Sequence, residues 1–222
     1  MISVEEATAI ILANAAVLKK RSVPLEEALG QTLAEVIEAD RDFPPFDRAT
    51  MDGIALSYDA FQSGIRTFPI ESVQAAGESV GNLNNSSHCI EIMTGAPVPI
   101  GTDCIIPYEQ LRITNRIADI EVTSVDRGQN IHRQGNDARQ GEKLLTPGTL
   151  ISPAEVALLA SVGKTEVLVY ELPKAAIIST GNELVDIDQQ PMPHQVRKSN
   201  SYALQAAWTS LGGTSALFHL DD

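Results

Sequence analysis

Between about residues 46 and 137 the sequence consists of short β-rich runs separated by turn residues, and this pattern limits the fold more than any other feature. The clearest runs are TFPIESVQAA, CIEIMT, DCIIPYEQLRI and IADIEVTSV, and clusters of Gly, Pro, Asn and Asp break them. Short runs rich in β-branched residues and bounded by turn residues are typical of strands. The pattern therefore predicts a β subdomain of short antiparallel strands.

The segments on either side of these runs carry signals for helices. Ser3 with Glu6, and Ser152 with Glu155, each form the spacing of a capping box, in which two side chains satisfy free backbone N–H groups. We expect the first helix to extend through Val17 to the cationic stretch 19–21, where the negative end of its dipole would lie.

The stretch between the first helix and the β-rich runs is harder to assign. Pro24 suits the first turn of a short helix that Gly30 would end. Residues 31–40 fit either a strand or a further helix. The sequence DFPP at 42–45 stops regular structure, because proline lacks the backbone N–H that helices and sheets use.

The last fifty residues predict one right-handed βαβ unit. KAAIIST is an apolar run without alternation, typical of a strand covered on both faces. A helix capped by Ser199 or Asn200 follows, reaching Gly212, and ALFHL forms a second strand. Two parallel strands and one helix do not make a stable sheet alone. We therefore expect the chain to be a truncated piece of a larger α/β domain.

Composition narrows the classes of function. The net charge of −13 argues against a nucleic-acid surface, which needs clustered Lys and Arg. An anionic substrate would need a local basic patch, a helix N-terminus or a divalent cation. There is no apolar run of about 18 residues and no basic, apolar leader at the start, which predicts no membrane partner. Cys89 and Cys104 lack metal-site spacing, so we expect reduced thiols and a cytoplasmic protein.

Two loops of the β-rich region carry candidate site residues. In the first, prolines 44 and 45 lead towards Asp52 and Gly53, and the glycine lets backbone approach closely. An ordinary Asp-Gly turn is the alternative. In the second, Thr94 and Gly95 follow a strand and offer a hydroxyl and backbone N–H groups to an oxyanion. The alternative is a rigid connector.

Two further loops add charged residues. Residues 130–137 contain Arg133, Gly135 and Asp137, whereas His132 fits an exposed loop histidine. The other histidines, at 88, 194 and 219, have no partner by spacing. Glu183 follows the first parallel strand, in the sequence STGNEL. Ligands of open α/β sheets bind at the carboxyl ends of the strands, which makes Glu183 the best-supported site residue on physical grounds.

The four loops appear in a specific order that resembles one known family. PPFD…MDG, TGAPVP, N-I-x-R-x-x-G-x-D and STGNEL are similar to the motifs of MoeA-type molybdopterin molybdenumtransferases, which include the E domain of gephyrin. The resemblance covers the whole chain. It implies a mixed α/β and β fold of several subdomains in an elongated homodimer.

The resemblance also implies a domain division. Residues 1–42 and 138–172 would form a helical and extended N-terminal subdomain, and 43–137 an inserted β subdomain. The first βαβ unit of a parallel, molybdopterin-binding α/β domain would occupy 173–222. The two ends of the insertion, near Asp52 and Asp137, are expected to lie close together, because the ends of compact units often do.

The family's reaction is the insertion of molybdate into adenylylated molybdopterin with release of AMP, and it uses Mg²⁺. Matched motif by motif, the resemblance implies catalytic roles for four residues: Asp52, Thr94, Asp137 and Glu183. It implies substrate-binding roles for Thr180, Gly181, Arg133 and Asp221, and metal contacts for Asp52, Glu183 and Asp221. A molybdopterin adenylyltransferase is an expected partner, and the piece of chain alone is expected to be inactive.

These roles fit elementary chemistry. Carboxylates repel anionic substrates, but they can hold Mg²⁺, which then contacts phosphate oxygens. Thr94, backbone N–H groups and Arg133 can contact oxyanions directly. The sequence departs from the family pattern at Asn136, at Lys198 and at Arg48–Thr50, where the family usually has Glu, Asp and Asn-Ser-Ala.

Two other functions compete with this interpretation. A dimerising scaffold of the same fold would need no catalysis. A nucleotide-handling hydrolase could use an STGNEL-type domain, but such proteins usually place that domain first, and here a long N-terminal part precedes it.

Overall fold

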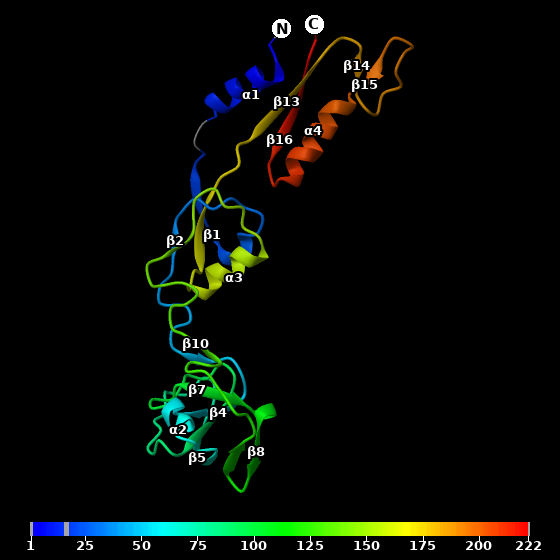
Figure 1. Ribbon diagram of the computed structural model, residues 1–222. Coiled ribbons are helices and arrows are strands. Elements are labelled where there is room, and N and C mark those ends of the chain that lie inside the picture. Colours follow the sequence, from blue (N-terminus) through cyan, green and yellow to red (C-terminus); the bar gives the residue numbers. More distant parts are fainter. Residues whose placement is uncertain (1, 16–17, 222) are drawn as a thin grey trace. The chain divides into compact units, whose positions relative to one another are not determined.

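The computed structural model describes residues 2–15 and 18–221, and the chain divides into two compact units (Figure 1). The inserted unit is Ile37–Leu144, and the flanking unit combines Met1–Val36 with Leu145–Asp222. The predicted domain boundaries at 42/43, 137/138 and 172/173 stay predictions. Among the described residues, no helix is both long enough and apolar enough to cross a membrane.

A six-stranded sheet forms the inserted unit, in the order β7-β4-β6-β5-β9-β8. Its strands are β4 (Gly53–Leu56), β5 (Thr67–Gln74), β6 (Cys89–Ile92), β7 (Cys104–Pro107), β8 (Leu111–Thr114) and β9 (Ile117–Ile120). Every β-rich run seen in the sequence contains at least one of these strands, so the predicted β subdomain is confirmed. The short helices α2 (Tyr58–Gln62) and η2 (Tyr108–Gln110) lie in connections between the strands.

The sheet differs from the prediction in two respects. Strands β5 and β6 are parallel rather than antiparallel, because residues 75–88 carry the chain back before β6 begins. Strand β4, next to the middle of the sheet, was not predicted. All four of its residues are buried, so the sequence GIAL shows none of the alternation that identifies a half-buried strand.

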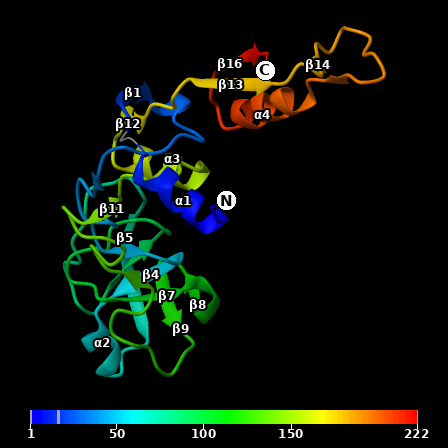
Figure 2. The same ribbon diagram turned by 90° about the horizontal axis from the view of Figure 1, so that it is seen from above.

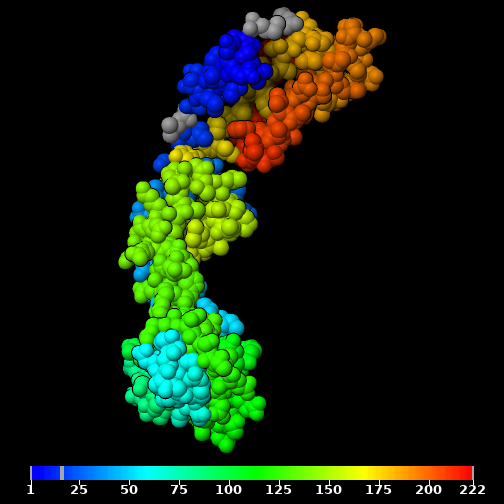
Figure 3. All heavy atoms as spheres, in the orientation of Figure 1, coloured from blue at the N-terminus to red at the C-terminus, as the bar shows by residue number. Residues whose placement is uncertain are grey.

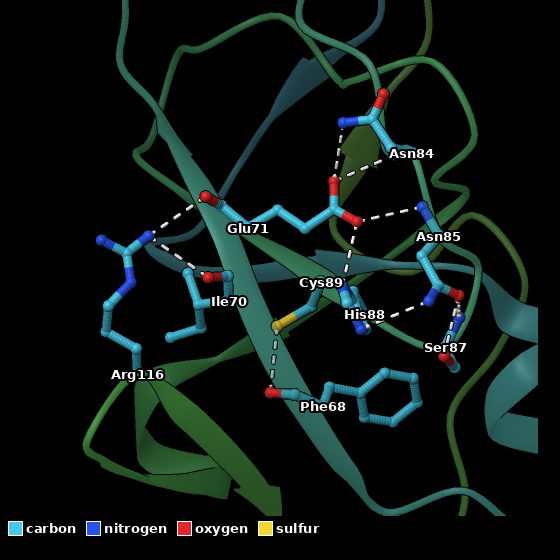
Figure 4. Close-up of polar contacts among 9 residues, drawn as sticks. All are labelled: Phe68, Ile70, Glu71, Asn84, Asn85, Ser87, His88, Cys89 and Arg116. Carbon is cyan, nitrogen blue, oxygen red and sulfur yellow. Dashed lines mark hydrogen bonds and ion pairs between the residues drawn. The ribbon is translucent and has the colours of Figure 1, made fainter.

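The long connection before β6 is held by one partly buried carboxylate (Figure 4). Glu71 of β5 accepts hydrogen bonds from the backbone N–H groups of Asn84 and Asn85, each at 3.0 Å. The same carboxylate lies 3.0 Å from Nδ1 of His88, a histidine for which spacing suggested no partner. These bonds lower the pKa of Glu71, with the Asn84 backbone bond as the largest cause. The connection therefore depends on an ionised Glu71.

The core of the inserted unit packs on both faces of the sheet, whose strands Figure 2 shows from a second direction. Phe61 and Phe68 are its largest side chains, and both are almost fully buried. Cys89 and Cys104 lie in the same core as free thiols, as predicted. Burial raises the pKa of each thiol to about 12, so both remain protonated at neutral pH.

Short pairings join the two ends of the inserted unit. Strand β3 (Arg48–Ala49) pairs with β10 (Ile131–His132), and β2 (Ile37–Glu38) pairs with β11 (Lys143–Leu145). Between them, the Phe43 N–H donates to the Ala138 carbonyl at 2.8 Å, and the Asp137 N–H donates to Phe43 at 2.8 Å. The two ends of the insertion, at 43 and 138, therefore lie side by side, while the expected closeness of Asp52 and Asp137 stays a prediction.

In the flanking unit, β1 (Lys20–Pro24) pairs antiparallel with β12 (Glu166–Tyr170). The short helix η1 (Leu25–Glu27) follows β1, and α3 (Pro153–Ser161) precedes β12. Both predicted capping boxes are present, at α3 and at α1 (Val4–Ala13).

The prediction for the end of the first helix needs correction. Helix α1 ends at Ala13, and Lys20 and Arg21 belong to β1, so they do not stabilise its carboxyl end. Residues 16 and 17, where the helix was expected to continue, lie outside the described residues. Residues 31–40, which the sequence left open, are not helical. They contain the isolated bridges of Thr32 and Leu33 and then β2.

The last part of the flanking unit contains a parallel pair, β13 (Ala175–Thr180) with β16 (Ser215–Leu220). Helix α4 (Ser199–Ser210) lies between them in sequence and packs against both strands. A second short parallel pair, β14 (Leu184–Val185) with β15 (Val196–Arg197), precedes the helix. The βαβ unit is thus present, while a larger α/β domain around it stays a prediction.

Two details of this part differ from expectation. The N-cap of α4 is Lys198, without a side-chain capping bond, so neither Ser199 nor Asn200 caps the helix. The strands are also not covered on both faces, because Ile178 and Phe218 remain more than half exposed.

Gly53 provides a test of this architecture. A Cβ atom at Gly53 would lie 2.8 Å from both the Ile106 carbonyl carbon and the Pro107 Cα of β7, which is too close for backbone atoms. We expect Gly53→Ala to lower the free energy of unfolding by about 3 kcal/mol, because the strands must separate. Gly64→Ala, at a positive φ with open space around it, should cost only about 1 kcal/mol. Urea unfolding followed by circular dichroism measures both. Equal losses would show that β4 and β7 are not this close.

Candidate functional site

Asp52 and Thr94 contact each other directly, although 42 positions separate them. Asp52 precedes β4 and Thr94 follows β6, and these neighbouring strands are antiparallel, so the start of one lies beside the end of the other. Oδ1 of Asp52 accepts hydrogen bonds from the backbone N–H of Thr94 at 2.6 Å and from its hydroxyl at 2.8 Å. The structure thus brings two predicted site residues together.

This contact sets the charge of Asp52. The Thr94 backbone bond and then the hydroxyl bond lower the pKa of Asp52, since both stabilise the ionised form. The side chain is exposed, and its second oxygen, Oδ2, accepts no hydrogen bond from a described residue. Asp52 therefore presents an ionised carboxylate with one oxygen available to a ligand.

Tyr108 and Glu91 border the same place, and sequence reasoning missed both. The Tyr108 N–H donates to the Asp52 carbonyl at 3.2 Å, and its hydroxyl donates to Oε1 of Glu91 at 2.6 Å. Burial, then the bond to Glu91, then the charges of Glu91 and Asp52 raise the pKa of Tyr108 well above its usual value. No local motif contains these residues, because three different segments meet here.

Asp137 lies in the same unit and contacts His132. The Oδ1 atom of Asp137 is 2.9 Å from Nε2 of His132, and the Asp137 backbone donates to Phe43. The expectation of an exposed loop histidine is wrong, since the His132 side chain is only 25% exposed and belongs to β10. Sequence reasoning missed His132 because neighbours five positions apart meet only when the loop turns back.

Arg133 is committed to a neighbouring carboxylate. Its guanidinium forms an ion pair with Asp47, and the Gln134 N–H donates to the same carboxylate at 2.8 Å. Asp42, five positions before Asp47, accepts a hydrogen bond from the Gln140 N–H at 2.9 Å. The Arg133 side chain is still half exposed. Its predicted contact with an oxyanion stays a prediction, and that contact would compete with Asp47.

The remaining predicted residues lie at the carboxyl ends of β13 and β16 in the flanking unit. Thr180 pairs with Leu220, and the Gly181 N–H donates to the Leu220 carbonyl at 3.3 Å, so Gly181 and Asp221 are close neighbours. The Glu183 carboxyl group folds back against Gly181. Its Cδ lies 2.8 Å from where a Cβ of that residue would be, so a larger side chain at Gly181 would push the Glu183 carboxylate aside.

A cavity of about 360 Å³ opens beside these strand ends, and among the described residues Thr180 is the only predicted site residue that lines it. Its other lining residues include Arg197, Lys198, Ser199, Asn200 and Ser201 at the start of α4. Lys198 forms an ion pair with Asp186 at 2.8 Å, which lowers the pKa of Asp186. This cavity joins cationic side chains to a helix N-terminus, an arrangement that favours anions.

The structure thus divides the predicted residues between its units. Asp52, Thr94, Arg133 and Asp137 belong to the inserted unit, and Thr180, Gly181, Glu183 and Asp221 to the flanking unit. Across residues 2–15 and 18–221, no three His, Cys, Asp or Glu side chains gather closely enough to hold a metal ion. Asp52 fits Mg²⁺ as a single ligand, because it is an ionised oxygen donor with a free oxygen.

Comparison with known proteins identifies the class to which this fold and these loops belong. The family model described as MoeA N-terminal region (domain I and II) matches residues 2–163. The match covers most of the chain, and the chain therefore belongs to the MoeA family.

Individual relatives agree with this assignment. A molybdopterin molybdenumtransferase of Synechocystis is 39% identical over the whole chain, which covers 57% of the relative. Molybdopterin molybdenumtransferase 1 of Mycobacterium tuberculosis is 33% identical over 93% of the chain, covering 53% of the relative. The crystal structure of the molybdopterin biosynthesis MoeA protein from Pyrococcus horikoshii OT3 superposes with a TM-score of 0.88, at 29% identity, over the whole chain and 60% of its own. The chain thus spans little more than half the length of these relatives.

The cause of the lowered pKa of Asp52 can be tested by removing one of its two hydrogen-bond donors. We expect Thr94→Val, which keeps the backbone N–H and loses the hydroxyl, to raise the pKa of Asp52 towards its ordinary value without reaching it. The pKa of Asp52 is lowered in the fold, so this contact stabilises the protein above the unfolded-state pKa. That contribution is lost as pH falls through the folded-state pKa. Carboxyl-carbon NMR titration measures the shift.

A matched pair in the same unit provides the control. The Thr67 hydroxyl donates to Asp119 at 2.7 Å, and Asp119 is exposed, so Thr67→Val removes a similar bond elsewhere. It should leave the Asp52 titration unchanged. An Asp52 pKa that is the same in wild type and Thr94→Val would contradict the assigned cause.

Proposed function

We propose that the complete protein is a molybdopterin molybdenumtransferase, a transferase that inserts molybdate into adenylylated molybdopterin and releases AMP. The observation that carries the proposal is the direct bond between Asp52 of the MDG loop and Thr94 of the TGAPVP loop, in a chain of the MoeA family. The names of relatives such as the Synechocystis protein support the reaction. The activity is proposed for the complete protein, because this chain spans only part of such relatives.

The proposal assigns roles within this chain. Asp52, Thr94, Asp137 and Glu183 act in catalysis, and Thr180, Gly181, Arg133 and Asp221 bind the substrate. Mg²⁺ would contact Asp52, Glu183 and Asp221, and when bound it supplies positive charge that neutralises phosphate oxygens. The ionised state and free oxygen of Asp52 support its role.

Anionic substrates also need positive groups in a chain whose net charge is −13. The cavity at the start of α4 supports this requirement, since Arg197 and Lys198 line it. The first N–H groups of α4 have no side-chain cap, so they remain available to an anion. A phosphate or molybdate group would find partners here in Arg197 and the N–H groups of α4, and it would compete with Asp186 for Lys198.

We also propose that the protein forms a homodimer and receives its substrate from a molybdopterin adenylyltransferase. Helix α1 supports an association, because it contains no buried residue and exposes Ile10, Ile11 and Leu12 (Figure 3, blue). Exposed apolar side chains on one helix are typical of surfaces that a partner covers. A complete protein that dimerises but inserts no molybdate would instead be a scaffold of this fold.

The central test is Asp52→Asn in the complete protein. We expect molybdate insertion to fall by at least about 100-fold, because the neutral amide removes the charge and the available carboxylate oxygen. The melting temperature should change little, since the side chain is exposed. AMP release and formation of molybdenum cofactor measure the activity.

Asp119→Asn is the matched control, because Asp119 is also exposed and also accepts a threonine hydroxyl. It should retain normal turnover. Glu183→Ala should lose activity as Asp52→Asn does. Normal turnover of Asp52→Asn with a normal melting curve would remove Asp52 from the site, and no turnover by the wild-type complete protein would refute the function.

A further inference from the structure

The His132–Asp137 contact is built into the backbone around it. β10 holds His132 opposite Arg48 of β3, and its neighbour Ile131 opposite Ala49. At the other end of the loop, the Asp137 N–H donates to Phe43 at 2.8 Å. Both partners are thus attached to the paired ends of the inserted unit, which brings Nε2 of His132 to 2.9 Å from Oδ1 of Asp137.

The chemistry of the contact defines which nitrogen carries the proton. A carboxylate can only accept hydrogen bonds, so Nε2 of His132 must be the donor. The Asn136 amide nitrogen lies 3.5 Å from the same Nε2 and can itself only donate. It cannot bond to Nε2 while that atom holds its proton. The carboxylate contact is shorter and charge-assisted, and therefore determines the tautomer.

Among the described residues, no lysine or arginine side chain forms an ion pair with Asp137. Arg133, four positions before Asp137, forms its ion pair with Asp47 instead. The loop between the partners is held separately, because the Gly135 N–H donates to the Pro44 carbonyl at 3.0 Å. The orientation of the Asp137 carboxyl group therefore depends on His132. The conformation of the loop backbone does not depend on His132.

We propose that His132 is a positioning residue for Asp137. Its Nε2–H holds Oδ1 and fixes the direction of the carboxylate, whose half-exposed surface leaves the second oxygen available to substrate. The inference rests on the proposed function of Asp137 and adds a residue to that site. It replaces the exposed loop histidine that the sequence suggested.

Two amide variants of nearly equal polarity test the proposal in the complete protein. His132→Gln keeps an N–H donor near the position of Nε2, whereas His132→Asn places its donor near Nδ1 and does not reach Asp137. We expect His132→Gln to keep kcat for molybdate insertion within about threefold of wild type. His132→Asn should lower kcat by at least about tenfold, because small displacements of a catalytic group are costly. Thermal melts should show the same folded state for both.

A measurement that does not depend on enzyme activity separates this inference from the proposed function. In the 222-residue chain labelled with ¹³C at aspartate carboxyl groups, His132→Asn should shift the Asp137 resonance and His132→Gln should leave it near its wild-type position. Equal resonances and equal kcat values in the two variants would overturn the positioning role. If Asp137→Asn keeps full activity while the resonance pattern holds, the catalytic role of Asp137 is wrong and the contact alone survives.

Discussion

The paired backbone of Phe43 and Ala138 closes the inserted unit, and the placement of its site residues depends on this joint. Phe43 donates to Ala138 and accepts from Asp137, so two segments almost a hundred residues apart run side by side. Two carboxylates close to Phe43 in the sequence reinforce this joint. Asp42 accepts hydrogen bonds from Gln134 and Gln140, and Asp47 forms an ion pair with Arg133. The ends of the inserted unit are thus fixed to each other by backbone and side-chain hydrogen bonds.

The sequence predicts much of this fold where the local pattern carries the physical cause. The capping boxes of α1 and α3 are such cases, because both partners lie within three residues. Strand β4 could not be predicted in this way, because burial on both faces removes the alternation of polar and apolar residues. The parallel pairing of β5 and β6 could not be predicted either, because the path of residues 75–88 determines it. Lys198 at the N-cap of α4 also departs from local capping preference.

The candidate site likewise contains residues that the sequence predicted and residues that it did not. The motif order pointed to Asp52, Thr94, Asp137 and Glu183, and the structure adds a reason for two of them to meet: β4 and β6 are antiparallel neighbours. The roles of His132 and of Tyr108 with Glu91 could not be predicted, because they arise where separate segments converge. Contacts of this kind require the register of the sheet and the closure of the joint, and neither appears in a single motif.

Amide hydrogen exchange of the 222-residue chain tests most directly whether the joint and the Asp52–Thr94 contact exist as preformed structure. The informative amides are those of Thr94, Gln134 and Asp137, each of which donates to Asp52, Asp47 or Phe43 in the inserted unit. The account predicts that these three loop amides exchange slowly, together with the amides of β4 and β6, because they open only when the unit opens. Exchange of all three at the rate of unstructured peptide, while β4 and β6 stay protected, would contradict it.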